Sequence, residues 1–202
     1  MLMKHLGSPR CWQRLIMKNK DTEYIYSPEE DTFLLSRIIQ KYAVNNALEI
    51  GTGSGLLALE LEVNNRFVVG VDLDFNALNE LRISIAKKKT GSKINIICCD
   101  SASPFRGDVF DLVVFNPPYL PSEKINDTTI DGGPSGVEIS KAWFKDASRI
   151  LRKDGRIVFL SSSISDVNGL FDYSRKLGFK VNVLKRKQLF FEELLAIEAR
   201  PI

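Results

Sequence analysis

Short apolar runs alternate with amphipathic segments along most of this chain. The runs predict β-strands, because they are rich in Val, Ile, Leu and Phe and are bounded by turn residues. The expected strands are 47–50, 66–72, 94–99, 110–115, the run RIVFLSS at 156–162, and two final runs, FKVNVLKRK and LFFEELLAIEA, joined by a tight turn. The segments between them predict helices, since apolar residues recur there at the spacing of one helical face.

Local signals indicate where the helices begin and end. Ser27-Pro28-Glu29-Glu30 indicates a capping box with proline at the first helical position, and Phe33, Leu34 and Ile38 follow as a buried face. A second helix is expected at LLALELE, and a third at about 75–89 with Asp74 as its N-cap. A fourth helix should end at about Leu151, before a turn at Asp154-Gly155. A fifth is expected at 167–177, with Gly178 as its C-cap.

This alternation predicts an α/β fold, a Rossmann-like doubly wound sheet of seven strands with helices on both faces. The sheet should be mostly parallel with the last strand antiparallel, because no helix separates the final two strands. We expect one domain over residues 1–202, with a short basic helical cap at about 1–26 in which Trp12, Leu15 and Ile16 share a face.

Composition places the chain among ordinary globular proteins, with 44% apolar and 26% charged residues and a net charge of +3. Three basic clusters, at 18–20, 87–89 and 185–187, are interpreted as solvated faces. Three cysteines without a C-x-x-C pair and a single histidine predict no metal site and suit a reducing compartment. Without an apolar run of membrane-spanning length or a signal-like N-terminus, we expect a cytoplasmic protein.

A glycine-rich turn follows the first strand and leads into a helix, which is a typical place for a nucleotide or anion. Gly51, Gly53 and Gly55 are spaced G-x-G-x-G. This spacing disfavours a dinucleotide, because Leu56 occupies the third glycine position of that fingerprint. It also disfavours a P-loop, since no Gly-Lys-Ser/Thr follows.

Three acidic residues belong to the same end of the predicted sheet. Asp72 ends the second strand, where an acid accepts hydrogen bonds from ribose hydroxyls, and Asp100 follows the third strand. With Glu49, the glycines form E-x-G-x-G-x-G, which resembles the first motif of the class I S-adenosylmethionine-dependent methyltransferases. The resemblance implies S-adenosyl-L-methionine as the cofactor, with Asp100 near its adenine amine.

The fourth strand ends in a rigid elbow, the sequence NPPY at 116–119. Proline fixes φ and lacks a backbone donor, so Pro117 and Pro118 stop the strand and hold Asn116 in an extended conformation. The string resembles motif IV of methyltransferases that alkylate planar nitrogens, in adenine, guanine or glutamine. The resemblance implies that the Asn116 side-chain carbonyl and the Pro117 backbone carbonyl hold the target NH2, while Tyr119 packs on the flat group.

The segment YSPEEDTFLL at 26–35 is similar to one in the HemK-like release-factor glutamine methyltransferases of archaea and eukaryotes. That family methylates the glutamine of the Gly-Gly-Gln loop in a class I translation release factor, and it resembles this chain over nearly its whole length. The resemblance implies cofactor contacts at Thr32 and Asn116 as well as at Glu49, Gly51, Asp72 and Asp100. It implies substrate contacts along Asn116, Pro117, Pro118 and Tyr119, and it places the loop DGGPSG at 131–136 beside the substrate cleft. Two features depart from the family pattern: the segment after Asp100 is short, and the bacterial members' N-terminal substrate domain is missing.

The sequence is compatible with an activator protein as partner and with two alternative functions. The family's eukaryotic members pair along a sheet edge with a small zinc-binding activator protein, and Cys98, Cys99 and Phe105 lie near the corresponding edge. A second hypothesis is a methyltransferase for exocyclic amines in RNA or DNA, which the basic clusters would favour. A third is a cofactor-binding protein without turnover, which the intact Asn116, Asp72 and glycines argue against.

Overall fold

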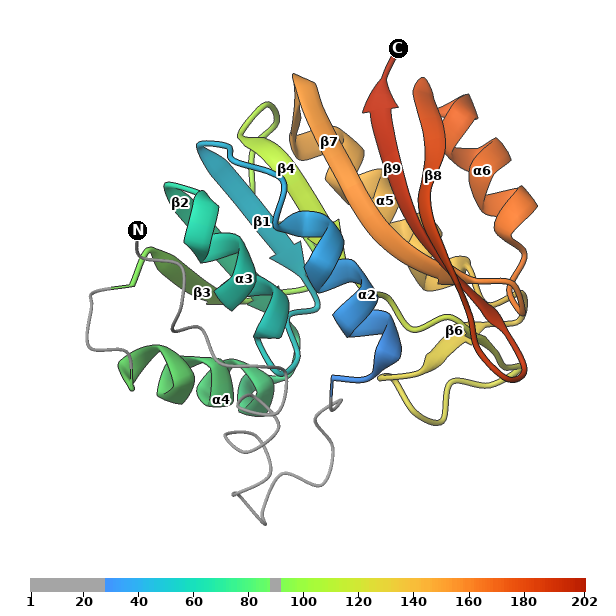
Figure 1. The fold of residues 1–202 in the computed structure, drawn as a ribbon, viewed down its shortest axis with the longest axis horizontal. Helices are drawn as coiled ribbons and strands as arrows, with labels where there is room; N and C mark the ends of the chain where they lie inside the picture. Colours follow the sequence, from blue (N-terminus) through green and yellow to red (C-terminus); the bar gives the residue numbers. More distant parts are fainter. Residues whose placement is uncertain (1–27, 88–91) are drawn as a thin grey trace.

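The computed structural model describes residues 28–87 and 92–202. Its core is a seven-stranded sheet in the order β3-β2-β1-β4-β7-β9-β8 (Figure 1). The strands are β1 (Asn46–Ile50), β2 (Phe67–Asp72), β3 (Ile94–Cys98), β4 (Phe110–Phe115), β7 (Leu151–Ser162), β8 (Phe179–Gln188) and β9 (Glu193–Pro201). Every pairing in this sheet is parallel except the two that β9 makes with β7 and β8. The predicted mostly parallel sheet with an antiparallel last strand is therefore confirmed.

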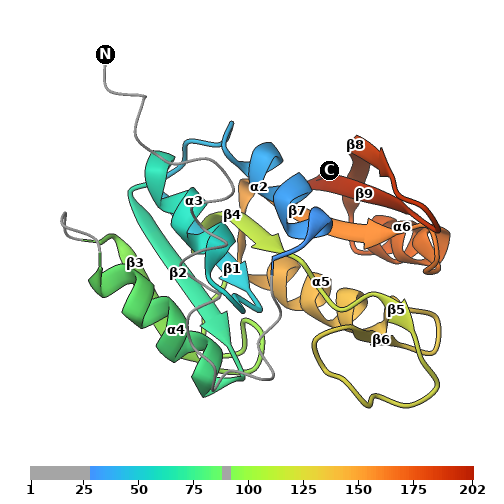
Figure 2. The ribbon, with the colours of Figure 1, turned by 60° about the horizontal axis from the view of Figure 1, so that its bottom comes forward.

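Helices cover both faces of the sheet (Figures 1 and 2). They are α2 (Glu30–Ile39), α3 (Leu56–Asn64), α4 (Phe75–Ala86), α5 (Glu138–Ile150) and α6 (Val167–Lys176). The apolar residues of α2 and α3, with Leu81 of α4, form one buried cluster, and those of α5 and α6 form another. Strand residues alternate between the clusters, with Val114 in the first and Phe115 in the second. Both strand faces are buried, which is why the strands are continuous apolar runs.

The segment between β3 and β4 contains no helix. Instead, Arg149 of α5 holds its backbone: Nη1 donates to the Phe105 carbonyl oxygen at 2.5 Å and Nη2 to that of Ala102 at 2.8 Å. The short connection noted after Asp100 is thus stabilised by a side chain from the neighbouring helix.

The predicted start of α2 is wrong. The helix begins at Glu30 with Glu29 at the N-cap position, and no side chain caps it, so Pro28 is not the first helical residue. The carboxylate of Glu30 makes an ion pair with Lys187 of β8. This ion pair joins α2 to the edge strand of the sheet, whereas Ser27, the predicted cap, lies outside the described residues.

Three predicted boundaries differ from the structure. No turn separates α5 from β7: Asp154 and Gly155 lie within the strand, at an irregularity in its register with β4. The final strand begins at Glu193, because the Leu189 N–H donates to the Glu192 carbonyl oxygen and closes a turn over the first apolar residues of the run. The sequence predicted no strand between β4 and α5, but the structure has a two-stranded parallel sheet there, β5 (Leu120–Pro121) with β6 (Asp131–Gly133). The predicted helical cap at 1–26 lies outside the described residues.

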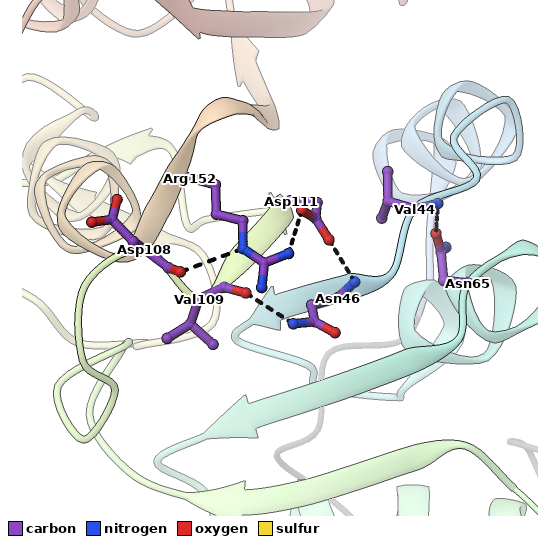
Figure 3. A network of polar contacts seen from close by, with 7 residues as sticks. All are labelled: Val44, Asn46, Asn65, Asp108, Val109, Asp111 and Arg152. Carbon is purple, nitrogen blue, oxygen red and sulfur yellow. Dashed lines mark hydrogen bonds and ion pairs between the residues drawn. The ribbon is translucent and has the colours of Figure 1, made fainter.

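A polar network ties β1, β4 and β7 together at the amino ends of the strands (Figure 3). The Asp111 carboxylate accepts hydrogen bonds from the Asn46 backbone N–H at 2.8 Å and from Arg152 Nη1 at 2.7 Å. The Asn46 side chain donates to the Val109 carbonyl oxygen at 3.0 Å. One carboxylate thus satisfies groups from two neighbouring strands.

None of the described helices has the length and apolar character needed to cross a membrane.

Replacing Asp111 with Ala should lower the free energy of unfolding by about 1–3 kcal/mol, because its two partly buried donors lose their acceptor. The matched control is Asp172→Ala, whose ion pair with Arg175 is more than half exposed on both sides and should contribute less than about 1 kcal/mol. Urea unfolding of the two variants measures the difference. Equal losses would contradict a special role for Asp111.

Candidate active site

A cavity of about 600 Å³ opens at the carboxyl edge of the sheet. This edge is where open α/β sheets bind their ligands, and the volume lies within the usual range for small-molecule sites. The cavity is enclosed by the first turn of α2, the ends of β1, β2 and β4, the glycine-rich turn and the segment 128–130.

The glycine-rich turn lets the backbone approach the cavity closely. Gly53 has φ +48°, and no atom lies within 4 Å of the position that a Cβ would take there. At Gly51, with φ +68°, a Cβ would lie 2.3 Å from the Trp143 ring of α5. A side chain at Gly51 would therefore displace Trp143, a cavity-lining residue that the sequence pattern did not single out.

Asp72 holds this turn in place. One carboxylate oxygen accepts from the Gly53 N–H at 2.8 Å, and the other accepts from the Asp74 N–H at 3.0 Å. Burial raises the pKa of Asp72 despite these bonds. Asp72, for which the sequence predicts a contact with ribose, therefore also fixes the backbone of the glycine-rich turn, a role that the sequence did not indicate. Asp74 caps α4 as predicted, accepting from the Asn76 N–H at 2.8 Å.

Glu49 lies buried beneath the turn, with 2% of its surface exposed. The Thr52 hydroxyl donates to Glu49 Oε2 at 2.6 Å. Burial raises the pKa of Glu49 to about 8, although the bond from Thr52 opposes the change. The carboxyl is therefore protonated over much of the neutral range in this structure.

The elbow is anchored by α2. The Asn116 Nδ2 donates to Asp31 Oδ2 at 3.2 Å and to Thr32 Oγ1 at 3.1 Å. A carboxylate only accepts hydrogen bonds, so these contacts require the NH2 of Asn116 to face α2 and its Oδ1 to face away. Among the residues that the structure describes, that buried Oδ1 has no hydrogen-bond partner. The elbow therefore presents a fixed acceptor that the rest of the described chain leaves unused.

Asp31 is the site residue that sequence reasoning missed. It is 3% exposed, lines the cavity, and accepts from the Tyr119 hydroxyl at 3.4 Å as well as from Asn116. Burial, together with the charges of Asp31 and Glu192, raises the pKa of Tyr119, so the phenol stays neutral. The only signal in the sequence is the place of Asp31 directly before Thr32.

The loop at 131–136 supports the elbow from behind, and none of its residues lines the cavity. A Cβ on Gly132 would lie 2.8 Å from the Pro118 carbonyl oxygen, and one on Gly136 would lie 2.5 Å from that of Tyr119. Ser165 Oγ also donates to the Tyr119 carbonyl oxygen at 2.6 Å. These glycines are needed because the two backbone segments touch.

Nearly all the predicted site residues meet in this one cavity. The lining includes Thr32, Glu49, Gly51, Gly53, Asp72, Asp100, Asn116, Pro117, Pro118 and Tyr119. Gly55 is outside the lining: it packs against α4, where a Cβ would lie 2.5 Å from Leu81. Lining residues that the sequence did not indicate include Asp31, Thr52, Cys99, Ser101, Trp143 and Glu192.

The cavity is strongly acidic. Its lining contains the carboxylates Glu29, Asp31, Asp72, Asp74, Asp100 and Glu192, in addition to the protonated Glu49. Within the described part of the chain, no lysine, arginine or histidine contributes to it. Such a site favours a cationic ligand over a polyanion.

Glu49 should make the stability of the protein depend on pH. The folded state keeps a proton that the unfolded chain, with an ordinary pKa of 4.5, releases, so the free energy of unfolding should fall as pH rises from about 5 to about 8. Urea unfolding across this range should show a steeper slope in the native protein than in Glu49→Gln, which keeps only the smaller contribution of groups such as Asp72. Glu60→Gln, whose carboxylate bonds Gln40 on the exposed side of α3, should keep the native slope. An unchanged slope in Glu49→Gln would contradict this assignment.

Known proteins resemble this chain over most of its length. The family model of the methyltransferase small domain matches residues 29–190. A Methanocaldococcus jannaschii protein, provisionally named a protein N5-glutamine methyltransferase, is 32% identical over 189 residues, covering 87% of this chain and 91% of that protein. The eRF1 methyltransferase catalytic subunit mtq2 of Schizosaccharomyces pombe is 27% identical over 201 residues, covering 85% of this chain and 87% of the relative.

The fold has a solved counterpart as well. A chain in the E. cuniculi Mtq2–Trm112 complex, which is responsible for methylating the translation termination factor eRF1, matches with a TM-score of 0.72 and 24% identity, covering 88% of this chain and 99% of that chain. The cavity described above lies almost wholly within the matched family segment. This chain therefore belongs to the methyltransferase small domain family.

Proposed function

We propose that this chain transfers a methyl group from S-adenosylmethionine to the side-chain amide nitrogen of a glutamine, the one in the Gly-Gly-Gln loop of a class I translation release factor. The unused, buried Oδ1 of Asn116 carries the proposal, because it is an acceptor fixed at the cavity and suited to a substrate NH2. The names of the archaeal and yeast relatives support glutamine and the release factor as targets.

The cavity fits the cofactor chemically. S-adenosylmethionine, when bound, supplies an electrophilic methyl group on a positively charged sulfur. Carboxylates at the carboxyl ends of successive strands, Asp72 and Asp100, can accept from ribose hydroxyls and an adenine amine. The acidic lining favours the positive charge, and the open side of Gly53 lets a ligand approach the backbone.

The elbow would act by positioning. An amide nitrogen is a poor nucleophile because its lone pair is delocalised over the carbonyl. Two acceptors, Asn116 Oδ1 and the Pro117 carbonyl oxygen, would hold both N–H bonds and so direct the lone pair at the methyl group. Such orientation can supply up to about 7–11 kcal/mol of the barrier, and the two prolines keep the acceptors from moving. Tyr119, kept neutral by its surroundings, can pack on the planar amide.

The charges favour a protein over a nucleic acid as substrate. Phosphate backbones are bound by lysine and arginine, and the cavity lining contains carboxylates instead. Within the basic cluster at 185–187, Arg186 pairs with Glu193 and Lys187 pairs with Glu30, so both are already neutralised. A release factor as substrate also implies a cytoplasmic reaction.

We further propose a small activator protein, which we expect to bind zinc, at the β3 edge of the sheet; the solved Mtq2–Trm112 complex and the name of the yeast catalytic subunit support a partner. Among the described strands β3 has a neighbour on one side only, so it is an edge strand to which a partner strand can be added. Leu73, Phe75 and Ile97 are 68%, 72% and 37% exposed near this edge, and Cys98 is exposed as well. Phe105 faces inward, with its ring 5.1 Å from that of Phe110, and is less suited to contact a partner.

The substrate class can be tested by methyl transfer from labelled S-adenosylmethionine into an extract of cells that lack the gene, using enzyme isolated with any partner it carries. Label should be lost on protease treatment, should lie in one band of release-factor size, and should map to the Gly-Gly-Gln glutamine. Label that nuclease removes would overturn the glutamine proposal in favour of a nucleic-acid amine.

In the same assay, Asn116→Ala should lower kcat by about 10²–10³, as expected for loss of one preorganised polar contact. Its affinity for the cofactor, measured by calorimetry, should be unchanged. The exposed Asn182→Ala on β8 serves as the matched control and should behave as the native enzyme does. Normal turnover by Asn116→Ala would make the elbow a structural feature only.

Asp31 should act as a positioning residue for Asn116. In Asp31→Ala the Asn116 amide can turn its NH2 toward the substrate, and kcat should fall by about 10–100-fold. Asp31→Asn still offers an acceptor to Asn116 Nδ2 and should recover most of kcat, with KM for the release factor little changed in both variants. If Asp31→Asn were as slow as Asp31→Ala, the charge of Asp31 would matter and not its placement of Asn116.

A further inference from the structure

The turn between β8 and β9, residues 189–192, displays two aromatic rings to solvent. Phe190 is 91% exposed and Phe191 is 87% exposed, the two highest values among the described aromatic residues. Their rings contact one another edge to face, with centroids 4.6 Å apart. Two adjacent and almost fully exposed phenylalanines form a small apolar patch of the kind found at binding surfaces.

The turn is held rigidly where it leaves the sheet. The Ser163 N–H donates to the Glu193 carbonyl oxygen at 2.9 Å, and the Glu193 N–H donates to Ser163 Oγ at 2.8 Å. The Ser162 hydroxyl bonds the Glu192 carboxylate, and Lys187 pairs with Glu30 of α2. The two rings are therefore presented on a preorganised support, which lowers the entropy lost on binding.

This turn lies beside the candidate active site. It is at the same edge of the sheet as the carboxyl ends of β1 and β4 (Figures 1 and 2). Glu192 lines the cavity, and its charge acts on Tyr119 of the elbow. β9 is separated from β4 by β7 alone, which corresponds to roughly 10 Å at the strand spacing of a sheet.

The surroundings indicate what this surface binds. The cavity beside this turn is lined by the carboxylates Glu29, Asp31 and Glu192, and no lysine or arginine is among its described lining residues. The exposed rings of Phe190 and Phe191 lie beside these three carboxylates, which form the acidic mouth of the cavity. Together they are complementary to a protein segment that has an apolar side chain and a lysine or arginine. They are not complementary to nucleic acid or to an anionic lipid surface, both of which carry negative charge.

We propose that the β8–β9 turn docks the protein substrate: Phe190 and Phe191 receive an apolar side chain of the release factor, and the acidic mouth receives a cation near the target glutamine. This inference rests on the proposed function. The turn then sets the affinity for the whole substrate, while Asn116 and its neighbours set the rate of the chemical step. Because the elements are separate, their effects on KM and kcat separate as well.

The test compares native enzyme, isolated with any partner it carries, with the double variant Phe190→Ser/Phe191→Ser. The substrate is the class I release factor of the same organism, and methylation of its Gly-Gly-Gln glutamine is followed by mass spectrometry. The variant should raise KM for the release factor by about 10–100-fold, the range expected for an aromatic hot spot, and leave kcat within about threefold. Cofactor affinity and unfolding should be unchanged, because the rings make no contact with the core.

A matched control is Ile202→Ser. Ile202 is 93% exposed and lies at the far end of β9, at the opposite edge of the sheet, so its loss should not alter KM. Glu192→Gln should raise KM more modestly and weaken the dependence of KM on salt, since it removes one charge from the mouth.

The outcomes separate the two levels of the proposal. An unchanged KM in a double variant that still methylates the glutamine would overturn the docking role and leave the proposed function intact. Failure of the native enzyme to methylate the glutamine would overturn the proposed function, and the docking role with it. A native dimer that becomes a monomer in the double variant, without a change in KM, would assign the rings to a second copy of the chain and overturn substrate docking.

Discussion

The arrangement of the site depends on one side-chain amide and the two groups that orient it. Asp31 and Thr32, in the first turn of α2, accept both hydrogens of the Asn116 NH2. These two bonds leave the Oδ1 of Asn116 directed away from the helix, buried and without a partner in the described chain. A buried acceptor without a partner is costly, of the order of 1–3 kcal/mol, and the protein tolerates this cost at the cavity where a substrate could satisfy it.

The fold explains why such an arrangement is stable. β4 lies next to β1 at the centre of the sheet, so the elbow that follows it projects into the same cavity as the glycine-rich turn. α2 packs on the sheet through its apolar face and is pinned to β8 by Glu30 and Lys187. The loop with Gly132 and Gly136 supports the elbow from the other side. The acceptor is thus held between elements that are each fixed elsewhere.

Much of this could be predicted from local sequence, with a few exceptions. The mostly parallel sheet, its antiparallel last strand and the assembly of Glu49, Asp72 and Asn116 at one edge follow from periodicity and from motifs that span a few residues. The roles of Asp31 and Trp143 could not be predicted from the sequence, because they depend on contacts between distant segments. Asp31 and Asn116, for example, are 85 positions apart. The start of α2 was predicted wrongly, because the first helical residue is Glu30 and not Pro28. Phe190 and Phe191 fitted a strand by pattern, although a single turn hydrogen bond leaves them exposed.

The central claim is that Asn116 Oδ1 receives the substrate amide. The most direct measurement is a crystal structure of the enzyme with the demethylated cofactor and a peptide containing Gly-Gly-Gln. The glutamine side-chain nitrogen should lie within about 2.7–3.2 Å of both Asn116 Oδ1 and the Pro117 carbonyl oxygen, with the bonds from Asn116 to Asp31 and Thr32 retained. A complex in which Asn116 Oδ1 bonds a donor of the protein itself, with the glutamine held elsewhere, would contradict this claim.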